Sequence, residues 1–331
     1  MSKKWLAIAL KATVSGGLIW YLVSGIDLAS LKSHIARVDV SLLVLATSVL
    51  SLQIFIGGAR WGSVLKGLQA PLPFSMTARL FFIGMFFNQA LPGGNGGDAA
   101  RMYLSRKHGA SLRNAINGVI VERVATVLAL VILVDVTQPL FLAHLQPEIA
   151  KMSVIGVVGI TLLAIVGIGL VAYLDRLPET LRRWRVVRGL GNLGIDTRQI
   201  LFSPARALMP LVWSLIGHLN VSLSCYVLAM AVGLDVTLLD CVVLIPPILL
   251  ILTIPISIGG WGVREGAMVT AFALVGVPGE GALVLSLLFG VIGLVVSLPG
   301  GIVWLMMRGK NDEAMIPGDE LSTLQSEQEN A

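Results

Sequence analysis

The chain has 331 residues, of which 56% are apolar and only 13% are charged, and its net charge is +5. Its mean hydropathy of +0.86 lies far above the range of soluble globular domains and predicts an integral membrane protein without a large soluble domain. In such a protein the excess of Lys and Arg marks cytoplasmic loops instead of a nucleic-acid surface, so no nucleic-acid partner is expected.

The chain begins with an apolar run at 5–23 behind Lys3 and Lys4. This run extends past the usual apolar core of a signal peptide and no small-residue cleavage site follows, so we interpret it as a retained first helix. A helix needs about 20 apolar residues to cross a bilayer, and uniform runs of this kind predict six membrane spans. The predicted spans cover about 5–23, 40–59, 115–134, 152–174, 208–232 and 281–307.

Two further apolar runs, at 74–91 and 239–258, each end in a glycine-rich break and continue as a shorter helical stretch. Basic residues cluster at the start of the chain, at 101–113 and at 176–206, and all three clusters face the cytoplasm if each broken run enters and leaves on one side. We therefore predict an all-α polytopic membrane protein with six membrane spans plus two re-entrant helical hairpins. The first hairpin enters from the cytoplasm and the second from outside, and both termini are cytoplasmic.

The remaining segments carry weaker signals. The polar, acidic stretch 311–331 predicts a disordered cytoplasmic tail behind a membrane domain at 1–310. The arginine-rich linker 175–206 is typical of an interfacial helix. Cys225 and Cys241 lie in or beside apolar segments and are interpreted as packed thiols. No Gly-Lys-Ser/Thr, GxSxG or HExxH motif is present, so we expect no cofactor, metal or catalytic residue.

Two glycine motifs recur along the chain. PGGNGGDAAR aligns with PISIGGWGVRE at an offset of 166 residues, as between Gly93 and Gly259, and this places Asp98 opposite Arg264. The same offset relates other spans of the two halves. Each element of the second half (about 152–307) then runs opposite to its counterpart in the first (about 5–134), which is the inverted-repeat plan of many secondary transporters. A chance match between short glycine motifs is the alternative.

Six charged residues lie at apolar depth near the glycine breaks: Asp98, Arg101, Glu122, Arg123, Arg264 and Glu265. Inserting an ionisable residue at the centre of a membrane helix costs about 2.5–3.5 kcal/mol even on lenient insertion scales, so each of the six needs a charged partner, water or a functional role. One interpretation is that the six converge and neutralise one another as buried ion pairs. The other, which does not exclude the first, is that the arginines and the backbone N–H groups of the glycine tips bind a phosphate.

Other polar residues in the apolar runs are interpreted chiefly as interhelical hydrogen-bonding groups. They are Gln53, Asn88, Gln89, His218 and Asn220.

Together, FFNQALPGGNGGDAAR, NGVIVERVATVLAL and PISIGGWGVRE resemble the flippase-like family named after the transmembrane region of lysylphosphatidylglycerol synthase. The resemblance covers roughly 5–307 and implies a stand-alone member that lacks the soluble aminoacyltransferase domain of the full synthases. Besides Pro92, the positions that match the family motifs become candidate substrate-binding residues. They are Asn88, Gly93, Gly94, Gly96, Gly97, Asp98, Arg101, Glu122, Arg123, Gly259, Gly260, Gly262, Arg264 and Glu265.

The resemblance implies a transporter: a translocase that moves the anionic headgroup of a phospholipid or polyprenyl-phosphate-type lipid across the cytoplasmic membrane, through a charged midplane site between the repeats. The expected partner is thus a membrane lipid with an anionic headgroup. Two alternatives stay open. One is a membrane-embedded transferase that acts on a lipid phosphate, with Asp98 or Glu265 as base. The other is a scaffold for a partner enzyme that modifies lipids.

Overall fold

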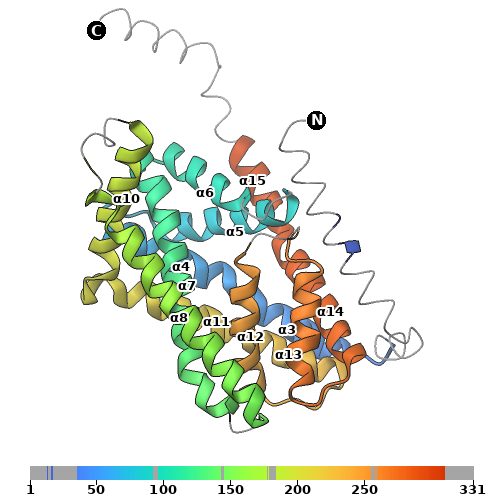
Figure 1. Ribbon diagram of the computed structural model, residues 1–331. Coiled ribbons are helices and arrows are strands. Elements are labelled where there is room, and N and C mark those ends of the chain that lie inside the picture. The colour runs from blue at the N-terminus through green and yellow to red at the C-terminus, as the bar shows by residue number, and fades with distance from the viewer. Residues whose placement is uncertain are drawn as a thin grey trace, which may run out of the picture.

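The computed structural model describes residues 36–91, 96–142, 145–176, 184–254 and 259–309, with the isolated positions 13, 16, 17, 178 and 257. Within these residues the chain forms α-helices and one short 3-10 helix, and no strand. The predicted all-α class is therefore confirmed (Figure 1). The predicted first span at 5–23, apart from three isolated positions, and the predicted tail at 311–331 lie outside the described residues.

Four stretches of helix in the described part of the chain are long and apolar enough to cross a membrane. They match the predicted spans at 40–59, 152–174, 208–232 and 281–307. They are formed by α3 (Val40–Ser51) with α4 (Gln53–Gly67), by α8 (Pro147–Ala172), by α11 (Pro204–Val232), and by α14 (Gly279–Ser297) with α15 (Pro299–Gly309). The predicted span at 115–134 lies within the 31-residue helix α7 (Leu112–Leu142).

Each glycine break separates two short helices. The first lies between α5 (Phe74–Ala90) and α6 (Gly96–Lys107), and the second between α12 (Leu238–Leu252) and α13 (Val263–Ala273). At about 1.5 Å per residue, even the 17 residues of α5 reach only about 25 Å, which is shorter than a ~30 Å hydrocarbon layer. Re-entry of these helix pairs into the membrane stays a prediction.

The helix bounds of the two halves follow the offset of 166 residues closely. Shifted by that offset, the starts of α3, α5 and α7 fall at 206, 240 and 278, and α11, α12 and α14 begin at 204, 238 and 279. An agreement within two residues at three helix starts is hard to reconcile with a chance match between short glycine motifs.

α7 is the central helix of the fold. It contacts α4, α6, α8, α10 (Arg185–Leu201), α11 and α12. In Figure 1 it runs beside α8, which follows it in the chain. Residues of α7 can therefore meet side chains from elements that are far apart in the sequence.

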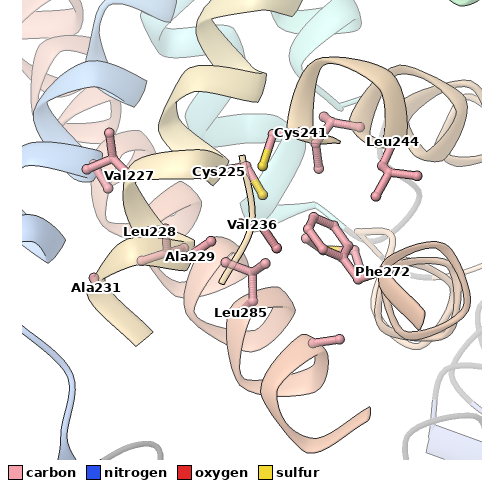
Figure 2. Packing of buried hydrophobic residues seen from close by; sticks show 14 of the residues in the cluster. Cys225, Val227, Leu228, Ala229, Ala231, Val236, Cys241, Leu244, Phe272 and Leu285 are labelled. Carbon is pink, nitrogen blue, oxygen red and sulfur yellow. The ribbon is translucent and has the colours of Figure 1, made fainter. Parts of the chain in front are cut away.

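The largest apolar core lies between α11, α12, α13 and α14 (Figure 2). Phe272 of α13 and Leu285 of α14 are fully buried there. Cys225 and Cys241 are also fully buried and are free thiols, and their sulfur atoms lie side by side in Figure 2. The prediction of packed thiols is thus confirmed.

α10 occupies the linker for which the sequence predicts an interfacial helix. Its apolar face docks on the protein, because Leu193 and Ile200 are buried against α4 and α7. Asp196 accepts hydrogen bonds from Arg113 Nε at 3.0 Å and from Asn117 Nδ2 at 2.6 Å, both on α7. α10 is therefore fixed to the helix bundle by specific ion pairs and packing.

Candidate functional site

Five charged side chains of alternating sign form a row where α4, α6 and α7 meet. In order, the row is Arg60, Glu122, Arg101, Asp98 and Arg123, and we call it the charge chain. Arg60 Nε donates to Glu122 Oε1 at 2.6 Å, and both Nη groups of Arg101 donate to Glu122 Oε2 at 3.0 Å. Arg101 Nη2 also donates to Asp98 Oδ1 at 2.7 Å, and Arg123 Nε donates to Asp98 Oδ2. Every carboxylate oxygen of the row is thus bound by an arginine.

Helix geometry explains how neighbouring residues reach this row. Asp98 and Arg101 are three residues apart on α6, so they share one face of the helix. Glu122 and Arg123 are consecutive on α7 and point about 100° apart, which buries one and leaves the other at the edge. The side chain of Glu122 is only 2% exposed and that of Arg123 is 47% exposed.

Aromatic rings and a glycine shape the pocket for Arg101. Its guanidinium lies 5.2 Å from the ring centres of both Trp61 and Phe81, so cation-π attraction adds to the ion pairs. A Cβ atom at Gly84 of α5 would lie 3.0 Å from Arg101 Cγ. The absence of a side chain at Gly84 therefore leaves room for the arginine to pass α5.

The charge chain borders a cavity of about 470 Å³. All five of its members line this cavity, together with Asn88 and Gly84 of α5 and Thr253 at the end of α12. Three arginines and two carboxylates leave a local charge of +1. The two Nη groups of Arg123 donate no hydrogen bond to a described residue, so an anion in the cavity can bind them without breaking an ion pair.

The glycines of the first break have packing roles. A Cβ atom at Gly97 would lie 2.0 Å from Gly84 O, and one at Gly96 would lie 2.6 Å from Phe87 O. α6 can therefore approach the backbone of α5 only because these positions lack a side chain. The N–H of Gly97 donates to Asn88 Oδ1 at 2.8 Å, so this donor is already used within the hairpin. Gly93 and Gly94 lie outside the described residues.

The structure does not bring Arg264 and Glu265 into the charge chain, in contrast to the predicted convergence of six charges. Neither residue lines the cavity. Arg264 Nη2 donates to Glu265 Oε1 at 2.5 Å, and Glu265 Oε2 accepts from the N–H of Gly262. Arg264 lies against Gly290 of α14, where any Cβ atom would collide with its guanidinium. The pair is internally neutral and braces the second hairpin.

The second hairpin still approaches the cavity through its glycine tip. Gly259, Gly260 and Gly262 have φ values of +59°, +82° and +87°, a region that L side chains rarely adopt, which confirms the prediction of positive φ at this break. The Cβ position of Gly259 lies 3.7 Å from Gln89 Oε1, next to the end of α5. The second glycine break therefore lies beside the C-terminal end of α5.

Gln53 and His218, two of the five predicted polar residues, join helices around the site, whereas the buried amide nitrogen of Asn220 has no hydrogen-bond partner among the described residues. Gln53 Nε2 donates to Gly217 O at 2.6 Å, which links α4 to α11. His218 Nε2 lies 3.1 Å from Thr126 O, which links α11 to α7. Both contacts lie beside the charge chain, since Gly217 is next to Arg60 and Thr126 lines the cavity.

The sequence analysis missed Arg60. The predicted span ended at residue 59, whereas the helix continues to Gly67 and carries Arg60 within it. A charged residue inside a 28-residue apolar stretch is a signal that could have identified it. Its partner, Glu122, is 62 residues away in the chain and only the packing of α4 on α7 shows the contact.

Comparisons with known proteins agree with this architecture. The profile of the family described as "Lysylphosphatidylglycerol synthase TM region" matches residues 8–300. The UPF0104 membrane protein PH1989 of Pyrococcus horikoshii is 29% identical over 133 residues, which cover 39% of this chain and 38% of that protein. The matched segment thus spans well under half of that relative. Because the profile covers most of the chain and several helices can span a bilayer, the chain is a multi-pass membrane protein that belongs to the family of the lysylphosphatidylglycerol synthase transmembrane region.

Proposed function

We propose that this protein is a lipid translocase, and that the cavity beside the charge chain receives the anionic headgroup during transfer across the cytoplasmic membrane. The observation that carries the proposal is the exposed end of the charge chain: the local charge is +1, and Arg123, which pairs with Asp98 through Nε, donates no hydrogen bond from either Nη group to a described residue. Arginine Nη groups bind phosphate oxygens in bidentate fashion, and the interaction strengthens where water is sparse.

The fold supports a transport role. Four short helices lie in two glycine-broken pairs, and the helix bounds recur at one offset, which fits an inverted repeat with two re-entrant hairpins inside six spans. Irregular backbone at membrane depth is tolerated where it is buried in protein or faces a wet cavity. Both hairpins meet this condition in the proposed topology, since α5 and the end of α12 line the cavity. The positions of the basic clusters favour this topology with both termini in the cytoplasm.

The transferase alternative is weaker on geometry. A general base needs a carboxylate oxygen that can accept a proton from its substrate. Both oxygens of Asp98 already accept from Arg101 and Arg123, and both oxygens of Glu265 accept hydrogen bonds within the second hairpin. A substrate proton would therefore have to compete with hydrogen bonds that these oxygens already accept. A scaffold role would not explain why the Nη groups of Arg123 are available at the edge of the cavity.

Arg123→Gln tests the proposal, because Arg123 is half exposed and its loss spares the buried pairs. Purified protein is reconstituted into vesicles that contain phosphatidylglycerol with a fluorescent headgroup, and transbilayer movement is followed by chemical quenching of the outer leaflet. A charge-assisted hydrogen bond contributes about 1.5–3 kcal/mol, so we expect a loss of about tenfold or more in rate.

The matched control is Arg106→Gln, which removes the same charge from an exposed position on α6 that does not line the cavity. We expect this variant to keep the rate of the native protein. Equal rates for native protein and Arg123→Gln would contradict the assignment of the headgroup site. Product formation from donor lipids by the purified protein would favour the transferase instead.

A further inference from the structure

An apolar groove of about 340 Å³ opens beside the charged cavity, between α6, α7 and α8. Its walls include Ile120 and Val124 of α7 and Ala164, Gly167, Ile168 and Val171 of α8. The groove and the charged cavity share Asp98, Arg123 and Val127 as lining residues. The exposed end of the charge chain therefore lies at the junction of a polar and an apolar compartment.

The groove has two defined ends. At one end Thr161 Oγ1 donates to Asp135 Oδ1 at 2.8 Å and ties α8 to α7. At the other end α10 packs against the last turn of α8, where a Cβ atom at Gly194 would lie 2.9 Å from Val171 O. The wall between Ala164 and Val171 is about 10 Å long at ~1.5 Å per residue, which suits a linear hydrocarbon chain.

α8 is suited to form a movable wall. Within the described part of the chain its main contacts are with α7, α10 and η1 (Leu174–Arg176), and the most apolar part of the helix buries none of its residues. At Gly167 a Cβ atom would meet nothing within 4 Å, so the space beside this wall is open. Few contacts oppose a small displacement of α8 away from α7.

Resting on the proposed function, we propose that the groove holds an acyl chain of the phospholipid whose phosphate occupies the charged cavity, and that the lipid enters between α7 and α8. A lipid must present its headgroup and its chains to adjoining polar and apolar spaces, and the shared residues provide this junction. The local charge of +1 matches a phosphodiester, which carries one negative charge. A phosphate monoester carries about −1.5 to −2 at pH 7 and would leave excess negative charge.

Photolabelling of the full chain tests this proposal. The probe is phosphatidylglycerol with a diazirine on one acyl chain, in nanodiscs of phosphatidylcholine, and adducts are mapped by peptide mass spectrometry. We expect many more adducts on 119–124 and 164–171 than on the preceding segment of α8, residues 152–163, which does not line the groove. Gly167→Trp fills the groove and lowers these adducts about tenfold.

Gly169→Trp is the matched control. It lies on the same helix at nearly the same depth but about 200° around the axis, it also has open space at its Cβ position, and it does not line the groove. We expect it to leave the adduct pattern unchanged. Even labelling along all of α8, or equal effects of the two tryptophans, would show annular lipid only and overturn the proposal.

Transport and photolabelling of Arg123→Gln and Gly167→Trp, together with competition by unlabelled lipids, separate this inference from the proposed function. Transport that is lost in Arg123→Gln but kept in Gly167→Trp overturns the groove and leaves the headgroup site in place. Groove adducts that depend on Gly167 but not on Arg123 support the groove and count against the headgroup site. Displacement of the probe by a polyprenyl monophosphate at lower concentration than by unlabelled phosphatidylglycerol overturns the phospholipid as occupant.

Discussion

Glu122→Gln removes the carboxylate that contacts two arginines of the charge chain at once. Glu122 Oε1 accepts from Arg60 and Oε2 from Arg101, and its side chain is 2% exposed. Glutamine has the same shape but no charge, so the local charge rises from +1 to +2 with two buried arginines facing one neutral amide. Removing one partner of a buried ion pair costs about 3–5 kcal/mol.

This cost should be visible as a lower melting temperature of the purified protein in detergent. For chains of this size about 1 kcal/mol shifts the Tm by ~2–4 °C, so we expect a decrease of roughly 6 °C or more. Glu148→Gln, at the exposed first turn of α8, is the matched control and should change stability by less than about 0.5 kcal/mol.

A second substitution tests whether excess buried positive charge causes this destabilisation. Arg60→Met in the Glu122→Gln background returns the local charge to +1 and leaves Arg101 paired with Asp98. We expect the double variant to recover about 1–3 kcal/mol relative to Glu122→Gln alone. No recovery, or a cost below about 1 kcal/mol for the single change, would show that water already screens these charges and that their burial does not govern stability.

Two further predictions concern packing and pH. Gly97→Ala places a Cβ atom 2.0 Å from Gly84 O, so it should separate α5 from α6 and lower the stability measured by thermal unfolding by about 3 kcal/mol or more. The control, Gly266→Ala, has open space around its Cβ position on α13 and should be neutral or slightly stabilising. Hydrogen bonds from Arg198 lower the pKa of Asp175 below its ordinary 3.8, so their stabilisation of α10 is present above that pH and is lost as the pH falls through the lowered value. The protection factors of the α10 amides, which compare each exchange rate with its intrinsic rate at the same pH, should then fall on acidification in the native protein. Asp175→Asn should show the lower protection already at neutral pH.

The fold could be predicted largely from local pattern. An apolar run of about 20 residues has few stable arrangements other than a helix across the bilayer, and a glycine-rich break ends such a helix because positive φ and close backbone contacts replace regular packing. Gly259 and Gly260 have the positive φ values that this argument requires. The recurrence of helix starts at one offset also follows directly from the sequence.

The site could be predicted only where its contacts are local. The pairing of Asp98 with Arg101 follows from their spacing on one helix face. The contact of Arg60 with Glu122 depends on how α4 packs against α7, which no periodicity encodes. Arg264 does not join the charge chain because its guanidinium donates to Glu265, the adjacent residue, and to Ser286 of α14.

The two halves share helix bounds but not charge, and this asymmetry restricts any transport mechanism. At the offset of 166 residues, four members of the charge chain have uncharged counterparts in the second half. Arg60, Arg101, Glu122 and Arg123 correspond to Tyr226, Ala267, Leu288 and Phe289. In the second half, the pair of Arg264 and Glu265 is neutral, so it offers no net charge with which to hold an anion. In the proposed mechanism, a headgroup that crosses between the halves therefore meets the charge chain on the first half, and the second half contributes Thr253, at the end of α12, to the lining of the same cavity.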